Sequence, residues 1–146
     1  VDRSRGLGDV YKRQDSGLQV HALGNKPGVY TADWAFTDKG RDFKKAMHRV
    51  WNELIETKKQ EPFTANFICT LVLTFPNGNE EIFEGIVNGT ITWPMRGRDG
   101  HGYDPIFIPD GHKRTFGEMT NSEKNKISHR SIALKKFISF YMNRIN

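Results

Sequence analysis

Residues 63–92, with the sequence FTANFICTLVLTFPNGNEEIFEGIVNGTIT, decide the fold expected for this chain. The first part, Phe63 to Phe75, is rich in β-branched and aromatic residues, which strands favour. Glu80 to Thr92 alternates between polar and apolar residues, and Pro76-Asn77-Gly78-Asn79 between the two parts is a turn sequence. The stretch therefore predicts a β-hairpin.

Helices are expected on both sides of this hairpin. From Arg41 to about Lys59 apolar residues recur at intervals of three and four, which predicts an amphipathic helix. After the hairpin, Ile106 to Ile108 predicts a short strand. A helix capped at Asn121 or Ser122 follows and continues from Ser128 to Asn143. Its buried residues are expected to be Ile132, Leu134, Phe137, Ile138 and Tyr141. These elements predict an α/β (α+β-like) fold with a mixed, twisted sheet flanked by helices.

Composition narrows the class of protein. The 146 residues suit one domain, and no apolar run approaches the roughly 20 residues of a membrane helix, so we expect no membrane partner. The net charge is +5, of which residues 1–14 contribute +2, so a stable nucleic-acid partner is not expected. The single cysteine, Cys69, excludes an intrachain disulfide. It is interpreted as a buried thiol of a cytoplasmic protein.

The stretch from Arg98 to Arg130, RDGHGYDPIFIPDGHKRTFGEMTNSEKNKISHR, combines a glycine-rich loop with a basic cluster. Gly100 and Gly102 allow the backbone to approach a ligand closely. Lys124, His129 and Arg130 can place several donors around phosphate oxygens. The pattern predicts a site for a flat ring and a polyphosphate.

Each residue of this stretch also fits an ordinary structural role when taken singly. Tyr103 could cover the edge of a core, Lys124 could be a solvated helix residue, and Asp104 before Pro105 suits a turn. A catalytically silent nucleotide- or RNA-binding module is therefore an alternative.

Two ordered strings resemble a known family. GYDPIFIPDGHKRTFGEM followed by EKNKISHR, and upstream DSGL at residues 15–18 followed by PGVY at 27–30, are similar to motifs of the Ham1 or inosine triphosphate pyrophosphatase family. The resemblance implies hydrolysis of ITP, dITP and XTP to the monophosphate and pyrophosphate with Mg²⁺. It also implies a homodimer. A related nucleotide pyrophosphatase with another base preference is a second alternative.

The resemblance assigns a role to each candidate residue. Asp15 stands where the family has the acidic residue that binds the metal and accepts a proton from the attacking water, and Ser16 would donate to the phosphates. Gly102, Tyr103 and Asp104 match the positions that hold the base, and His101, where Phe is common, can still stack on a purine. His129 and Arg130 would donate to the six-keto group, which would disfavour adenine. Lys124 would bind the phosphates.

The beginning of the chain departs from the family pattern. Residues 1–14 carry no recognisable family segment and no expected element, and Gln14 stands where a second Asp usually precedes Asp15. Our hypothesis is that residues 1–14 are an artefactual leader and that residues 15–146 are a partial domain. This domain would lack the family's N-terminal strand and helix, and the loss would impair stability and hydrolysis.

Overall fold

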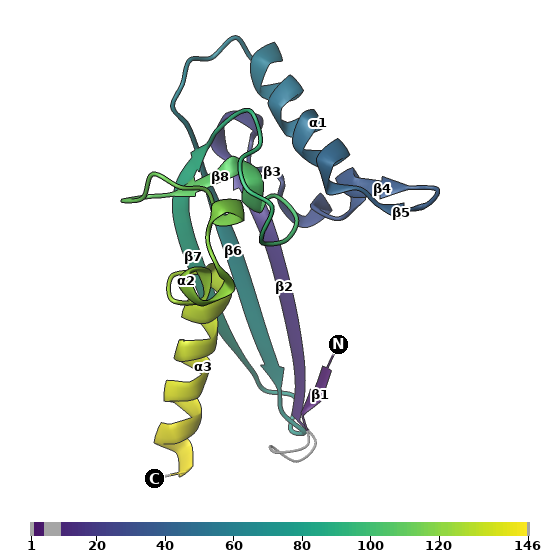
Figure 1. Cartoon of the computed structure of the whole chain (residues 1–146). Helices are drawn as coiled ribbons and strands as arrows, with labels where there is room; N and C mark the ends of the chain where they lie inside the picture. Colours follow the sequence, from purple (N-terminus) through teal and green to yellow (C-terminus); the bar gives the residue numbers. More distant parts are fainter. Residues whose placement is uncertain (1, 5–9, 146) are drawn as a thin grey trace.

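The computed structural model describes residues 2–4 and 10–145. Its centre is a long antiparallel sheet built mainly from β2 (Val10–Val20), β6 (Phe63–Thr74) and β7 (Glu80–Ile91) (Figure 1). The order is β1-β2-β6-β7-β8, and β3 also pairs with β2. The short strands are β1 (Asp2–Ser4), β3 (Lys26–Pro27) and β8 (Phe107–Pro109). The expected α/β class, with a twisted sheet and flanking helices, is confirmed, but every strand pair among the described residues is antiparallel, so the sheet is not mixed as expected.

The β6–β7 hairpin forms as the sequence predicts. Its register runs from Phe63 opposite Ile91 to Thr74 opposite Glu80. The turn is closed by the Gly78 amide, which donates to the carbonyl of Phe75 at 2.9 Å. Because side chains alternate along a strand, one face of the hairpin carries the large apolar residues and becomes the floor of the core.

The amphipathic helix is also confirmed, as α1 (Phe43–Glu56). It begins where the Asp42 carboxylate accepts from the backbone amide of Lys44 at 3.0 Å, an N-cap that satisfies a free helical donor. A small hairpin of β4 (Phe36–Thr37) and β5 (Gly40–Arg41) precedes α1. The 3₁₀ turns are η2 (His21–Leu23), η3 (Gly28–Tyr30), η4 (Asp33–Ala35), η5 (Asp104–Ile106) and η6 (Phe116–Glu118).

Strand β2 begins within residues 1–14, for which no element was expected, and that expectation is corrected. Part of the proposed leader, residue 1 and residues 5–9, lies outside the described residues, but residues 10–14 form the first half of β2. Each residue from Tyr11 to Val20 faces one of Thr74 to Ala65 in β6. Residues 11–16 are mostly polar and give no strand signal of their own. They form a strand because they pair with β6 by hydrogen bonding.

The C-terminal helical region divides into α2 (Asn121–Asn125) and α3 (His129–Ile145). The cap of α2 is Thr120, whose hydroxyl accepts from the Glu123 amide at 3.1 Å, not Asn121 or Ser122. Leu134 and Ile138, expected in the core, are 42% and 48% exposed. They point away from the sheet, because the side of α3 that packs against the sheet is the one that carries Ala133 and Phe137. None of the helices in the described ranges is long and apolar enough to cross a membrane.

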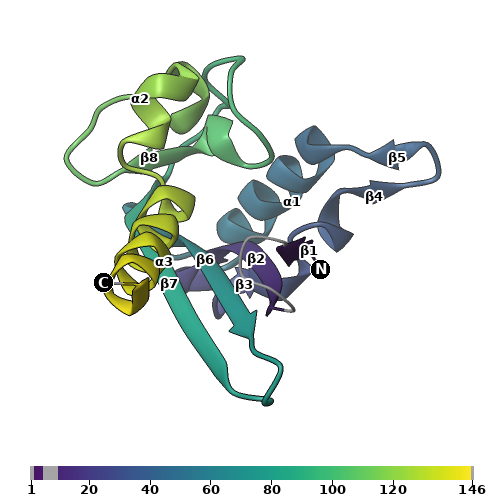
Figure 2. The same ribbon diagram turned by 90° about the horizontal axis from the view of Figure 1, so that it is seen from below.

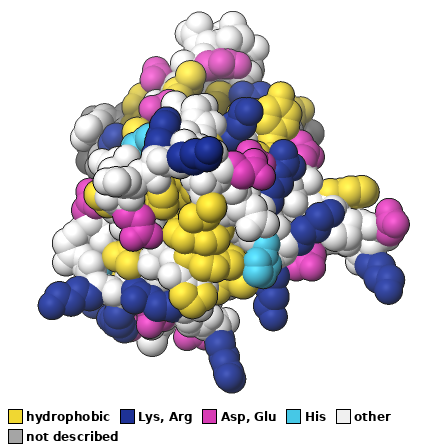
Figure 3. Space-filling view, turned by 90° about the horizontal axis from the view of Figure 1, so that it is seen from above, with side chains coloured by type: hydrophobic (Ala, Val, Ile, Leu, Met, Phe, Trp, Pro, Cys, Tyr) yellow, Lys and Arg dark blue, Asp and Glu magenta, His cyan; other side chains and the backbone are white. Residues whose placement is uncertain are grey.

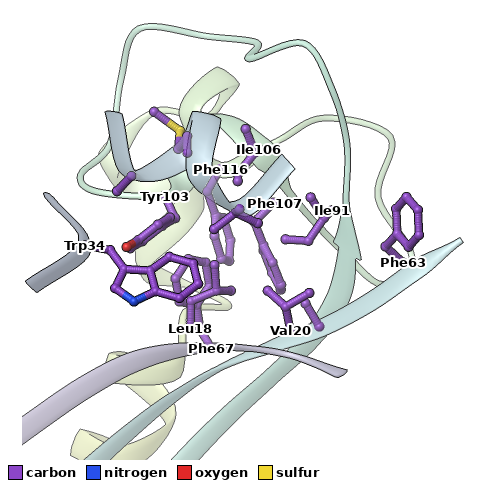
Figure 4. Packing of buried hydrophobic residues seen from close by; sticks show 14 of the residues in the cluster. Leu18, Val20, Trp34, Phe63, Phe67, Ile91, Tyr103, Ile106, Phe107 and Phe116 are labelled. Carbon is purple, nitrogen blue, oxygen red and sulfur yellow. The ribbon is translucent and has the colours of Figure 1, made fainter. Parts of the chain in front are cut away.

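The sheet carries two separate groups of buried side chains. The larger lies under α1 and the glycine-rich loop and includes Leu18, Val20 and the ring cluster of Phe67, Phe107 and Phe116 (Figure 4). The smaller lies under α3 and consists of Cys69, Leu71 and Ala133, with Phe83 and Phe137 against it. Cys69 is fully buried, as expected, and burial raises the pKa of its thiol. Ser16 pairs with Cys69 across the sheet, so it stands at the seam between the two groups.

Candidate active site

A cavity of about 620 Å³ opens at this seam, between the middle of β2, the glycine-rich loop and the first turns of α2 and α3. Ligand pockets of drug-sized molecules fall in the range of about 300–1,000 Å³. The cavity collects every residue for which a substrate contact was expected: Ser16, His101, Gly102, Tyr103, Asp104, Lys124, His129 and Arg130. Residues that are far apart in the sequence therefore meet in one place.

His129 forms the back of the cavity. Its Nε2 lies 2.6 Å from the Ser16 hydroxyl, and its ring stacks on Phe67 with centroids 5.0 Å apart. Burial, followed by the charges of Lys124 and Arg130, lowers the pKa of His129 to about 4. The imidazole is therefore neutral at pH 7. Its Nδ1 is buried and has no hydrogen-bond partner among the described residues.

Asp104 and Lys124 form a buried ion pair, with side chains 3% and 16% exposed. The same carboxylate oxygen of Asp104 accepts from the backbone amide of His101 at 2.7 Å. Asp104 therefore ties the glycine-rich loop to α2. In this arrangement Asp104 and Lys124 bind each other, and the expected contacts of Asp104 with the base and of Lys124 with the phosphates stay predictions.

Glycine is required in this loop for a steric reason. Gly100 has a φ of +85°, and a Cβ on it would overlap the Asp104 carboxylate. Gly102 also adopts a positive φ, of +61°. Residues that carry a Cβ rarely adopt a backbone conformation with positive φ. The glycines thus let the loop close over the Asp104 carboxylate and leave His101 exposed at the mouth of the cavity.

Tyr103 is buried and joins the loop to the other wall. Its hydroxyl donates to the carbonyl of Thr31 at 2.8 Å, and its ring meets Phe43 edge to face at 5.6 Å. Burial raises the pKa of the Tyr103 phenol. The Tyr103 ring is buried against Phe43 and the core, whereas the His101 ring two residues earlier is exposed. Of these two rings, His101 is thus the accessible one for stacking on a base.

Asp15 lies on the opposite face of β2 from Ser16, because neighbouring side chains of a strand alternate. It lines an adjoining cavity of about 470 Å³ that shares Ser16 and Gly17 with the first one. Its carboxylate is exposed and lies 3.5 Å from the Arg13 guanidinium. In the described ranges no three His, Cys, Asp or Glu side chains gather as metal ligands. A single carboxylate suits a Mg²⁺ that shares its ligands with substrate phosphates.

Several residues in the cavity wall were not expected from the sequence. They are Arg41 at the end of β5, Phe43 at the start of α1, Asn121 and Asn125 on α2, and Ser128 before α3. The spacing of four between Asn121 and Asn125 places both on one side of α2, and this was a readable signal. Arg41 had none, because it was expected only as the first residue of the amphipathic helix and belongs to no motif of the site.

Arg130 is exposed at the rim of the cavity, on the first turn of α3. With the Gln14 amide oriented so that its oxygen faces Arg130, that oxygen accepts from the guanidinium Nε at 2.8 Å. The amide is neutral, so it orients the guanidinium and leaves its positive charge uncompensated. Arg130 can therefore still attract an acceptor of a bound ligand.

Close packing of α3 on β7 holds His129 and Arg130 in place. A Cβ on Gly85 would overlap the carbonyl of His129 and crowd the amide of Ala133. We expect Gly85→Ala to lower the free energy of unfolding by about 1–3 kcal/mol, because the start of α3 must move. Urea unfolding measures the loss. Asn88→Ala, on the exposed face of the same strand, is the control, and an equal loss in both variants would contradict the prediction.

The fold and the cavity together define a class, an α/β protein with a cationic cleft where a strand meets the starts of two helices. The chain belongs to the Ham1 family, whose profile matches residues 10–140. It is 52% identical over 124 residues to a dITP/XTP pyrophosphatase of Ruegeria pomeroyi, which covers 85% of this chain and 61% of the relative. It is 50% identical over 135 residues to a dITP/XTP pyrophosphatase of Agrobacterium fabrum, covering 85% and 63%.

Solved structures of the family share the fold. A HAM1 protein from Coxiella burnetii superposes with a TM-score of 0.85 at 31% identity, over 97% of this chain and 70% of that one. The Ham1 protein of Staphylococcus aureus gives a TM-score of 0.84 at 29% identity, over 97% and 71%. The chain spans less than two thirds of the length of the two curated relatives above.

Proposed function

We propose that this chain carries the base-recognising part of a pyrophosphatase that hydrolyses ITP, dITP and XTP to the monophosphate and pyrophosphate. The observation that carries the proposal is the convergence of eight expected substrate contacts in one cavity of nucleotide size. Relatives at 46–52% identity that are named dITP/XTP pyrophosphatase support it. A cytoplasmic homodimer is part of the same proposal and rests on the family resemblance.

Base selection in this proposal depends on donors at the rim and back of the cavity. Arg130 supplies N–H groups to the six-keto oxygen of hypoxanthine or xanthine, and His101 stacks on the ring. Adenine presents an amino donor at the same position, so a donor would face a donor and the hydrogen bond to Arg130 would be lost. Ser16 and His129 bind each other and hold this wall at a fixed distance from β2.

In the proposed reaction Asp15 accepts a proton from the water that attacks the α-phosphorus. A new oxygen–phosphorus bond forms while the bond from the α-phosphorus to the bridging oxygen breaks, and pyrophosphate leaves. A bound Mg²⁺ would supply stabilisation of the charge on the phosphate oxygens. Asp15 would be its protein ligand, and its exposure in the adjoining cavity leaves room for a phosphate-bound ion.

A panel of ITP, dITP, XTP, ATP and GTP tests the proposal, with both binding and pyrophosphate release as readouts. We expect ITP, dITP and XTP to bind more tightly than ATP, because adenine lacks the six-keto oxygen, whereas GTP carries this oxygen and tests whether the rest of the base is also read. An RNA-binding module would instead show affinity that falls steeply with salt and little base preference. The face in Figure 3 intersperses Lys and Arg with acidic and apolar side chains, which favours a small ligand over a nucleic-acid backbone. Equal affinity for all five nucleotides would reject the proposal.

Arg130→Ala is expected to reduce the preference for inosine over adenosine nucleotides by roughly 10- to 100-fold, the effect of losing one charge-assisted hydrogen bond. Titration of both nucleotides into both proteins measures the ratio. Lys135→Ala, which removes an exposed cation of the same helix, is the control. An equal loss of affinity for inosine and adenosine nucleotides would show that Arg130 binds phosphate, and the base-reading role would then be wrong.

A further inference from the structure

The charged side chains that line the cavity include a phosphate-binding candidate that lies outside the family motifs. Apart from the histidines, the charged side chains in the wall are Arg41, Asp104, Lys124 and Arg130. Asp104 neutralises Lys124 within a buried pair. The positive charge still available to a polyphosphate therefore belongs to Arg41 and Arg130.

Neither arginine is paired with a carboxylate in the part of the chain that the structure describes. Throughout residues 10–145, no Asp or Glu lies within ion-pair distance of Arg41 or Arg130. Asp42, the neighbour of Arg41, is engaged as the N-cap of α1 through the amides of Lys44 and Lys45. A guanidinium that lines a cavity and is not neutralised by a carboxylate is able to bind an anion there with charge-assisted hydrogen bonds.

The two arginines approach the cavity from different parts of the fold. Arg41 ends β5 and stands next to Phe43, whose ring packs against Tyr103 and borders Gly102. Arg130 comes from α3. Figure 2 shows the β4–β5 hairpin and α3 on opposite sides of the view, with β2 between them. A ligand in the cavity is therefore flanked by two cations, of which one reads the base in the function proposed above.

We infer that Arg41, and not Lys124, is the residue that binds the phosphates of the nucleotide in this cavity. The inference rests on the proposed function for the identity of the base, but not for the phosphate. Lys124 then acts as a positioning residue, since it holds Asp104 and through it the amide of His101. Substrate phosphates can reach Arg41 without breaking a buried ion pair, whereas recruiting Lys124 would leave Asp104 buried and unpaired.

The experiment compares Arg41→Met with Lys39→Met, which removes an exposed cation at the tip of the same hairpin. Inosine, inosine monophosphate, ITP and inorganic triphosphate are titrated into each protein and into the unchanged chain. We expect Arg41→Met to weaken ITP and triphosphate by roughly 10- to 100-fold and to leave inosine unchanged. Lys39→Met should change none of them, and Arg41→Lys should restore part of the affinity because it keeps the charge but not the fork.

The variant Lys124→Met tests the role of Lys124. We expect it to weaken the binding of inosine and of ITP by the same factor, because it loosens the glycine-rich loop and removes no phosphate contact. A loss confined to ITP and triphosphate in Lys124→Met, with Arg41→Met unaffected, would overturn the inference. Arg41-dependent triphosphate binding without any preference for inosine nucleotides would support the inference and reject the proposed function. Thermal melts of each variant separate these effects from unfolding.

Discussion

Asp104→Ala is expected to lower the free energy of unfolding by about 3–5 kcal/mol, the cost of leaving a buried charge without its partner. Lys124 keeps only 16% of its side chain exposed, so its ammonium cannot recover full hydration after the carboxylate is removed. The backbone amide of His101 loses its acceptor in the same variant. Urea unfolding at pH 7 measures the loss.

Two further variants isolate the cause. Asp104→Asn keeps an oxygen acceptor of the same shape and should lose less stability than Asp104→Ala. The double variant Asp104→Ala with Lys124→Met removes the stranded charge, so it should be more stable than Asp104→Ala alone. If Lys124→Met only added its own cost to that of Asp104→Ala, the two side chains would not be coupled, and the assignment of a buried ion pair would fail.

Stability should also fall by about 3 kcal/mol between pH 6.5 and pH 4 on account of His129. Its pKa is about 4 in the folded protein and near 6.5 in the unfolded chain. The unfolded state therefore takes up the proton first as the pH falls, and folding becomes less favourable across this window. The contribution is fully present above pH 6.5 and fully lost below pH 4.

Chemical unfolding at pH 7.5 and pH 4.5 measures this dependence. His129→Gln removes the titrating group and should flatten the curve in this window, whereas His112→Gln, at an exposed histidine, should leave it unchanged. Glu123, whose pKa is lowered to about 2 by Arg114, loses its interaction only below about pH 4.5, so it acts in a different range. A slope that persists in His129→Gln would assign the effect to other groups.

Local patterns in the sequence were enough to predict α1 and the β6–β7 hairpin, because each element carries its own periodicity and its own turn or cap. Strand β2 was not predictable in the same way. Its residues before Leu18 are mostly polar, and they are extended because β6 offers them a row of hydrogen-bonding partners. The exposed positions of Leu134 and Ile138 were missed because only a neighbouring element decides which side of α3 is covered.

The sequence was enough to predict which residues would line the cavity together, but not how they would pair with one another. Motif order brought Ser16 and His129 into one hypothesis, although 113 residues separate them. Nothing in the residue types indicated that Ser16 would bind His129, or that Asp104 would occupy Lys124. Such pairings follow from the distances that the fold sets, and they alter which cations remain for a ligand.

The two groups of buried side chains described above have a consequence for motion. A protein opens in cooperative units, and a unit held by few apolar contacts opens more often than one held by many. The group under α3 is small, so α3 should detach from β7 in excursions that leave the phenylalanine-rich group closed. A molecule bound across the seam would have to be released for each excursion. Its binding free energy would therefore make the detachment of α3 from β7 less frequent, and the two units would open together as one.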